Sequence, residues 1–198
     1  MVLYNPKTKT LFRRDDNFKV MTDHFTDDRY RQVTDWLVTE KMDGMSVILS
    51  TNDGFHGRSP KTQFQGKTLA FMEQAMHSVA YRFFQKDIEN VDVYAELVGP
   101  QVQGNPHNLT ELQLFVFDVR IGDYWLDWHN VVDVAEKAGL QTVEVKGRWT
   151  MPHIIADVKA RKALGDGYFE GYVARTDPYL YDNQGNRIVW KLKGTDFA

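Results

Sequence analysis

The chain has 198 residues, a length typical of one domain, and its 42% hydrophobic and 26% charged residues favour a packed core over disorder. It contains no cysteine, which excludes disulfide frameworks, thiol nucleophiles and thiolate zinc sites. No apolar run approaches the roughly 20 residues of a membrane helix, and residues 1–16 lack the apolar stretch of a signal peptide. We therefore expect a soluble, cytoplasmic protein that does not bind membranes.

The net charge of −3 is unevenly distributed along the sequence. Residues 1–20 carry five basic and two acidic groups, and residues 56–86 carry five basic groups, including Lys67 and Lys86, against one glutamate. Residues 87–140 carry ten acidic groups against two basic ones, so this block hides the positive segments in the total. The net charge alone therefore does not exclude a nucleic-acid partner, although ordinary solvated surface accounts for it equally well.

The hydrophobic patterns predict many strands and few helices, with little β–α–β alternation. Two strand-forming runs within residues 36–51 flank a turn at residues 41–44, and a helix is expected over residues 67–86. The later elements are a strand at 91–98, a turn-rich loop at 101–108, a hairpin over 112–125, a helix at 130–138, a strand at 142–145, a helix at 152–164, and strands at 169–175 and 187–193. This order predicts an α+β fold with mostly antiparallel sheets flanked by helices.

Four charged fragments lie on or beside the predicted strands. They are Glu40 to Gly44 (EKMDG), Glu96 in VYAELVGP, Glu170 in FEGYVAR, and Lys191 with Lys193 in VWKLKG. A lysine such as Lys41 becomes a nucleophile only when neutral, and nearby cations favour the neutral form. Lys191 and Lys193 alternate along one strand, so both project from the same face, where they suit a phosphate. The two strand glutamates suit ribose hydroxyls and a hydrated divalent cation.

In this order the fragments resemble nucleotidyltransferase motifs I, III, IV and V of the polynucleotide ligase and capping-enzyme superfamily. The segment LFVFDV (residues 114–119) resembles the intervening motif whose aromatic residue stacks on the nucleotide base, and Gly57 to Ser59 (GRS) resembles the ribose-contacting motif. The resemblance extends from about residue 40 to residue 193. It implies that residues 1–198 form a single nucleotidyltransferase (adenylation) domain without an OB-fold domain.

The resemblance also implies roles for individual residues. Lys41 would attack the α-phosphate of ATP and hold AMP as a lysyl phosphoramidate, with Mg²⁺ or Mn²⁺ stabilising charge. AMP would then pass to the 5′-phosphate of a nick, and the 3′-hydroxyl would displace AMP to seal the strand. The resemblance assigns Lys41, Glu170, Lys191 and Lys193 to catalysis, Glu96 and Glu170 to the metal, and nucleotide contacts to Glu40, Lys41, Asp43, Arg58, Glu96, Phe117, Lys191 and Lys193.

Several alternatives remain open at the level of sequence. Phe115 competes with Phe117 for the stacking role, and Arg58 is as readily a surface residue. AELVGPQVQGNPHNL resembles double-strand repair RNA ligases of phages, whereas KxDG is usual in DNA ligases and capping enzymes. We expect an ATP-dependent ligase, phage-like and monomeric, that acts on nicked duplex DNA, RNA or hybrid. A capping-type guanylyltransferase and a non-catalytic nucleic-acid-binding relative are the alternatives.

Overall fold

The computed structural model describes residues 7–59, 61–84, 88–165 and 167–197. These residues form two compact units, and the boundaries between the units fall after residues 41 and 143. We call residues 42–143 the central unit, and residues 7–41 together with 144–197 the terminal unit.

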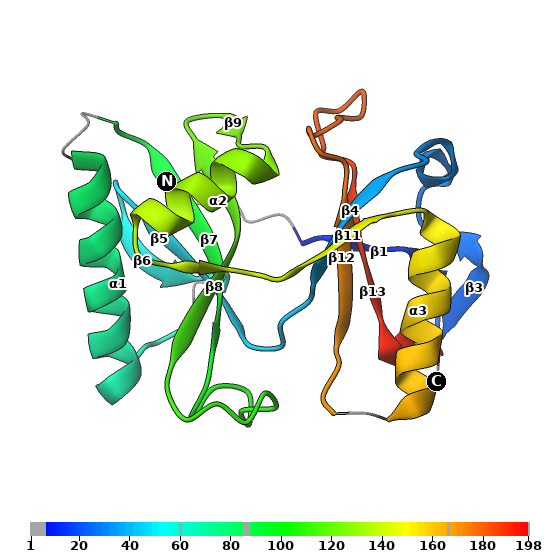
Figure 1. Cartoon of the computed structure of the whole chain (residues 1–198), viewed down its shortest axis with the longest axis horizontal. Helices are drawn as coiled ribbons and strands as arrows, with labels where there is room; N and C mark the ends of the chain where they lie inside the picture. The colour runs from blue at the N-terminus through cyan, green and yellow to red at the C-terminus, as the bar shows by residue number, and fades with distance from the viewer. Residues whose placement is uncertain (1–6, 60, 85–87, 166, 198) are drawn as a thin grey trace. The chain divides into compact units, whose positions relative to one another are not determined.

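The central unit is built on a sheet with the strand order β10-β8-β7-β5-β6, to which β9 adds by pairing with β8. Its strands are β5 (Met45–Ser50), β6 (Gly54–Gly57), β7 (Val91–Val98), β8 (Gln113–Ile121), β9 (Tyr124–Trp125) and β10 (Gln141–Thr142). Helix α1 (Gly66–Phe84) contacts β5 and β6, and helix α2 (Trp128–Lys137) contacts β8 and β10 (Figure 1). The apolar side of α1 is buried through Met72 and Val79, as the spacing of those residues predicts.

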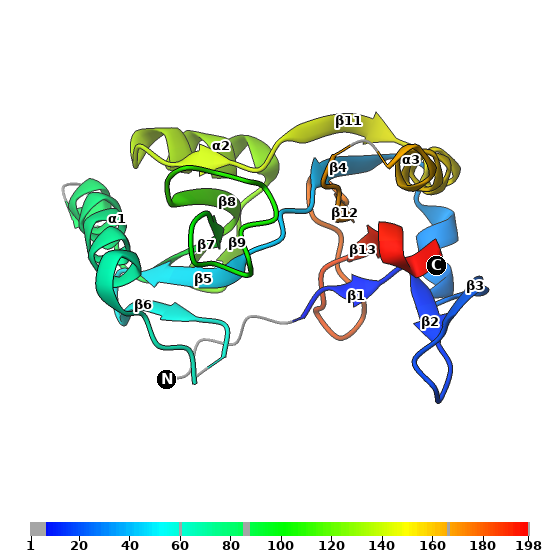
Figure 2. The same cartoon turned by 90° about the horizontal axis from the view of Figure 1, so that it is seen from below.

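The terminal unit contains a five-stranded sheet with the order β1-β13-β12-β4-β11, and a separate hairpin. Its elements are β1 (Lys9–Thr10), β2 (Phe12–Arg14), β3 (Val20–Phe25), η1 (Asp28–Gln32), β4 (Trp36–Glu40), β11 (Val145–Trp149), α3 (Met151–Leu164), β12 (Gly171–Arg175), β13 (Val189–Lys193) and η2 (Gly194–Phe197). Figure 2 shows β1 beside β13, with which it pairs in parallel, and α3 near the end of β13.

Alternation along β13 separates the core of the terminal unit from a charged face. Trp190 and Leu192 are fully buried and join a core cluster that includes Trp36 and Tyr172. Lys191 lies between Trp190 and Leu192, and Lys193 follows Leu192. Both lysines therefore project to the face opposite the core. Burial of the two apolar residues therefore fixes the direction of both lysines.

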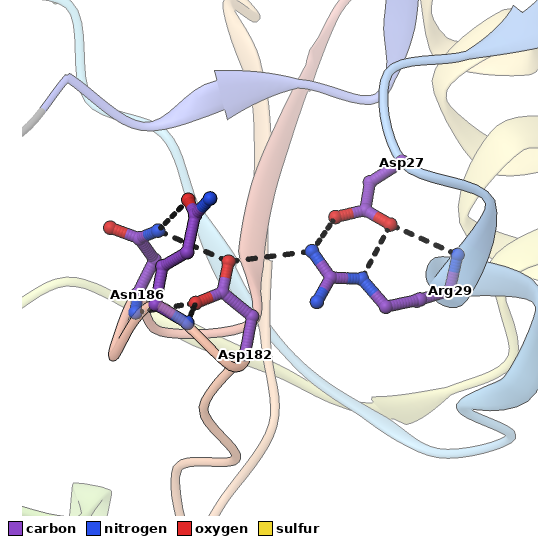
Figure 3. Close-up of polar contacts among 5 residues, drawn as sticks. Asp27, Arg29, Asp182 and Asn186 are labelled. Atoms are coloured by element: carbon purple, nitrogen blue, oxygen red, sulfur yellow. Dashed lines mark hydrogen bonds and ion pairs between the residues drawn. The ribbon is translucent and has the colours of Figure 1, made fainter.

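The loop between β12 and β13 is held by a hydrogen-bonded turn and an ion pair (Figure 3). The Asp182 carboxylate accepts from the backbone and side chain of Asn186, and it lies 3.3 Å from a guanidinium nitrogen of Arg29. Arg29 also binds Asp27 at the start of η1. Hydrogen bonds from Asn186 are the largest cause of an Asp182 pKa lowered to about 2.

The predicted α+β class with mostly antiparallel sheets is confirmed. Apart from the strand at 142–145, so are the strands, hairpin and helices expected between residues 36 and 175, with small shifts of their ends. Residues 85–87, including Lys86 of the predicted helix and basic segment, lie outside the described part. The single strand expected at 142–145 is wrong: β10 ends at Thr142 and pairs with β8, whereas β11 begins at Val145 and pairs with β4. Among the described residues, no helix combines the length and apolar character of a membrane span.

Candidate active site

A carboxylate between two lysines forms the charged centre of the terminal unit. The side chain of Glu170 is only 8% exposed, and its Oε2 lies 2.6 Å from Nζ of Lys41 while its Oε1 lies 2.5 Å from Nζ of Lys193. The side chain of Lys41 is 19% exposed, so the nucleophile predicted from the sequence is partly shielded from water. Formal charges of +1, −1 and +1 leave this trio with a net charge of +1, which attracts an anion such as a phosphate.

Strand ends bring the three residues of this trio together. Lys41 directly follows β4, and its backbone N–H donates to the carbonyl of Gly171 at the start of β12. Gly171 is paired with Lys193 across the β12–β13 ladder, and the N–H of Gly194 donates to the carbonyl of Glu170. The sheet register and these backbone hydrogen bonds therefore place the backbones of Lys41, Glu170 and Lys193 side by side.

Gly171 is required where the chain enters β12. Its φ of +148° lies in a region that side chains rarely adopt, and a Cβ there would lie 2.1 Å from the carbonyl oxygen of Leu192. The tight approach of β12 to β13 therefore depends on glycine, and it is this approach that sets Glu170 next to Lys193.

Lys191 lies on the same face of β13 as Lys193, as predicted, and its register partner on β12 is Val173. Both lysines are partly exposed. Lys191 would raise the formal charge of this strand face by one, consistent with a phosphate-binding role.

Glu40 is held by a residue that the sequence did not reveal. Its Oε2 lies 2.6 Å from Nζ of Lys146 on β11, and the same ammonium lies 2.6 Å from Oε2 of Glu144. Burial lowers the pKa of Lys146, but hydrogen bonds to Glu144 and Glu40 outweigh it and raise the pKa above its ordinary value. The hydrogen bond from Lys146 to Glu144 also holds the pKa of Glu144 below its ordinary value. Lys146 is thus a firmly charged ammonium beside Glu40.

The KMDG turn continues into the central unit, where Asp43 and Gly44 lie. The backbone N–H of Asp43 donates to Nε2 of His107 at 3.0 Å. A Cβ on Gly44 would lie 2.2 Å from the carbonyl oxygen of Leu97 and 2.6 Å from a methyl group of Val98. Glycine is therefore needed at this turn for close approach to β7, a reason that is independent of any bound phosphate.

The remaining predicted residues of the central unit lie across adjacent strands. Glu96 on β7 pairs with Ser46 on one side and with Phe115 on the other. The backbone N–H of Arg58 donates to the carbonyl of Ser46 at 3.0 Å, which places Arg58 near the same row. One sheet therefore brings the backbones of Arg58, Glu96 and Phe115 into one row.

Phe117 lies at an irregularity of β8 rather than in regular alternation. Tyr94 pairs with Asp118 and Ala95 with Val116, so Phe117 is the extra residue of a β-bulge. Regular alternation would put Phe115 and Phe117 on one face of the strand, and the bulge interrupts that alternation between them. Both rings are partly exposed, so the choice between them as a stacking residue stays a prediction.

A buried carboxylate that the sequence analysis missed supports the end of β13. Asp196 accepts from the backbone N–H of Lys193 at 2.9 Å and from Arg14 at 2.8 Å, and its side chain is only 2% exposed. Arg14 also donates to the carbonyl of Phe18 in the β2–β3 hairpin. An acidic residue three positions after Lys193 is too common a pattern to identify such a contact from sequence.

The described residues contain no group of three or more His, Asp or Glu side chains placed to hold a metal. Mg²⁺ often binds one or two protein carboxylates and completes its shell with water and substrate phosphates. Glu96 and Glu170 each offer such a carboxylate, and Glu170 lies beside cations that also attract phosphate. Glu96 and Glu170 therefore fit a cation that is brought in by a bound nucleotide. They fit less well a metal that the protein holds on its own.

Comparison with solved structures defines the class of fold. Naegleria gruberi RNA ligase with pyrophosphate matches with a TM-score of 0.65 and 18% identity, covering 100% of this chain and 59% of that chain. A mutant of the same ligase with ATP and Mn matches with a TM-score of 0.62 and 18% identity, covering 83% of this chain and 50% of that chain. Another mutant, with AMP and Mn, matches with a TM-score of 0.63 and 17% identity, covering 98% of this chain and 58% of that chain. The fold is therefore shared with part of this RNA ligase, and the chain spans between half and three fifths of these structures.

The family model of RNA ligases matches residues 34–193, from just before β4 to the end of β13. The chain belongs to the RNA ligase family. The comparison with curated protein sequences gave no significant match.

Proposed function

We propose that this protein is an ATP-dependent ligase that seals 5′-phosphate/3′-hydroxyl nicks in duplex nucleic acid, with RNA ends as its preferred substrate. The observation that carries the proposal is the trio of Lys41, Glu170 and Lys193, a shielded lysine within hydrogen-bond distance of a carboxylate in a positively charged centre. Membership of the RNA ligase family supports this reading, as do the ATP, AMP and Mn in the solved Naegleria structures.

In the first step, Nζ of Lys41 attacks the α-phosphorus of ATP. The ammonium of Lys41 first gives one proton to the solvent, so that Nζ attacks as a neutral amine. A P–N bond forms, the bond from that phosphorus to the bridging oxygen breaks, pyrophosphate leaves with the electron pair, and the nitrogen gives a further proton to the solvent. Glu170 contacts Nζ and is placed to orient it, and Lys191 and Lys193 offset the negative charge of the phosphates. A divalent cation, when bound, supplies further charge neutralisation at the phosphates.

Two further transfers complete the reaction. An oxygen of the 5′-phosphate attacks the phosphorus of the lysyl-AMP, so the P–N bond breaks and AMP moves to the nucleic acid. The 3′-hydroxyl then attacks the 5′-phosphate, a phosphodiester forms, and AMP leaves. In this proposal Glu40 reads the adenine edge, Arg58 and Glu96 contact the ribose, Phe117 stacks on the purine, Asp43 contacts the nucleotide, and Glu96 and Glu170 bind the metal.

A sealing assay on matched nicked duplexes tests the proposal. The duplexes contain RNA, DNA, or one strand of each at the nick, and each is incubated with ATP and Mg²⁺ or Mn²⁺. We expect sealing that is greatest with an RNA 3′-hydroxyl strand and that falls to background in Lys41→Ala. Lys137→Ala is the matched control, because Lys137 pairs with Asp133 on the exposed surface of α2. Absence of sealing on every duplex, or labelling by GTP in place of ATP, would overturn the proposal.

A further inference from the structure

The side chain of Lys146 is directed by a β-bulge. Val145 on β11 pairs with Thr39 on β4, and Gly147 pairs with Val38, so Lys146 is the extra residue between two consecutive pairs. A bulge of this kind redirects a side chain that regular alternation would send elsewhere, and such bulges are frequent beside active sites. Here it brings the ammonium to Glu40, the residue immediately before Lys41.

The contact between Lys146 and Glu40 is shielded and consists of more than one interaction. The two side chains are 14% and 20% exposed, whereas Glu144, the other carboxylate on Lys146, is 69% exposed. The backbone N–H of Glu40 donates to the carbonyl of Glu144 at 2.8 Å, which fixes the two strands where the ion pair forms. A shielded ion pair loses less of its strength to water and salt than an exposed one.

We infer that Lys146 is a positioning residue for nucleotide choice, which fixes the Glu40 carboxylate so that it faces a purine edge as a hydrogen-bond acceptor only. This inference rests on the proposed function and on the base-reading role of Glu40 within it. An ionised carboxylate accepts hydrogen bonds but donates none. It therefore matches the exocyclic amine of adenine and opposes the carbonyl that hypoxanthine carries at the same ring position.

Loss of Lys146 releases this constraint. In Lys146→Met, the Glu40 carboxylate has no ammonium to hold it and can rotate to accept from the ring N–H of hypoxanthine. Discrimination between ATP and ITP then falls, because selectivity of this kind depends on a polar group that cannot adapt to the wrong partner. Lys146→Arg retains a cation that reaches carboxylates, so we expect it to retain most of the discrimination.

The test measures the covalent transfer of labelled nucleoside monophosphate from ATP and from ITP, with kcat and KM for each. We expect the ATP/ITP ratio of kcat/KM to fall by about tenfold or more in Lys146→Met, the effect of one displaced hydrogen bond to a charged group, and mainly through KM. Lys146→Arg and the surface control Lys137→Met should stay near the wild-type ratio. A reduced folded fraction scales the rates with both nucleotides equally, so the ratio stays informative in a destabilised variant.

Three results would contradict the inference, each in a different way. An unchanged ratio in Lys146→Met, with a reduced ratio in Glu40→Gln, means that Glu40 reads the base without help from Lys146. An unchanged ratio in both variants means that Glu40 does not read the base, while the ligase function stands. Failure of the wild-type protein to take label from either nucleotide overturns the proposed function together with the inference.

Discussion

At the scale of single residues, the centre of the site is a balance of charges around Glu170. One buried carboxylate contacts two ammonium groups, so neither Lys41 nor Lys193 lies in this centre without a counter-charge. An incoming phosphate would compete with Glu170 for the same cations. Because the trio keeps a net positive charge, it can bind an anion without first losing the carboxylate. The contact with Glu170 also limits where Nζ of Lys41 can lie, which favours attack from one direction.

His107 is expected to hold the turn that follows Lys41. The imidazole Nε2 accepts from the N–H of Asp43, so His107→Leu leaves that amide without this acceptor and should lower the free energy of unfolding by about 1 kcal/mol. His107→Gln places an amide oxygen near the position of Nε2 and should recover much of the loss. Chemical denaturation of both variants, together with the rate of AMP transfer, measures the effect. Equal losses in the two variants would show that the ring, rather than its acceptor nitrogen, matters.

At the scale of elements, irregular positions in the strands occur beside several candidate site residues. Lys146 and Phe117 are the extra residues of two bulges, and Gly171 enters β12 with a positive φ. The two bulges interrupt regular alternation, and bulges redirect side chains at functional sites. The elements of the site thus combine regular strands, which set the register, with local distortions that direct individual side chains.

Gly171→Ala tests the approach of β12 to β13. The added methyl group would meet the carbonyl of Leu192, so we expect the free energy of unfolding to fall by at least about 2 kcal/mol. Gly165→Ala at the end of α3 is the control, because it also has a positive φ but has nothing within 4 Å of the added Cβ, and it should cost about 1 kcal/mol. Denaturant unfolding of the two variants gives the comparison. Similar losses would mean that the contact with Leu192 relaxes without cost.

These irregular positions also explain which parts of the site the sequence could predict. Lys191 and Lys193 follow from simple alternation with Trp190 and Leu192, and Lys41 and Glu170 follow from recognisable motifs. The contact of Lys146 with Glu40 depends on one extra residue in a strand pair of distant segments, and no local pattern marks it. The strands of residues 9–25 were missed. β1 and β2 have two and three residues, which carry too little periodicity to indicate a strand. β3 has six residues, but Phe25 is its one buried residue, so it shows no alternation of buried and exposed positions.

At the scale of the whole molecule, the chain forms its two units from interleaved segments. The terminal unit takes residues from both sides of the central unit in sequence, and β1, from the beginning of the chain, pairs with β13 near residue 191. Ion pairs join the same distant segments, including Arg14 with Asp196 and Arg29 with Asp182. The stability of the terminal unit therefore depends on contacts between segments more than 150 residues apart.

The Asp182 contacts predict a dependence of stability on pH. Its pKa is lowered from 3.8 to about 2, mainly by hydrogen bonds from Asn186. A carboxylate with a lowered folded pKa contributes stability that is fully present above its unfolded value and is lost as the pH falls through the folded value. We expect the free energy of unfolding to decrease between about pH 4 and pH 2, and Asp182→Asn to remove this part of the decrease.

Denaturant titrations across that pH range measure the effect. Asp23→Asn serves as the control, because the side chain of Asp23 is 82% exposed. An identical acid dependence in the wild-type protein and Asp182→Asn would show that the turn at Asp182 does not contribute to acid sensitivity.

The most direct test of the account is the position of the covalent adduct. The protein is incubated with ATP and Mg²⁺ or Mn²⁺, digested under conditions that preserve phosphoramidates, and mapped by mass spectrometry. We expect one AMP group on Lys41 and no adduct in Lys41→Ala, whereas Lys137→Ala should be labelled like the wild-type protein. An AMP group on another residue, or labelling that persists in Lys41→Ala, would contradict the assignment of Lys41 as the nucleophile.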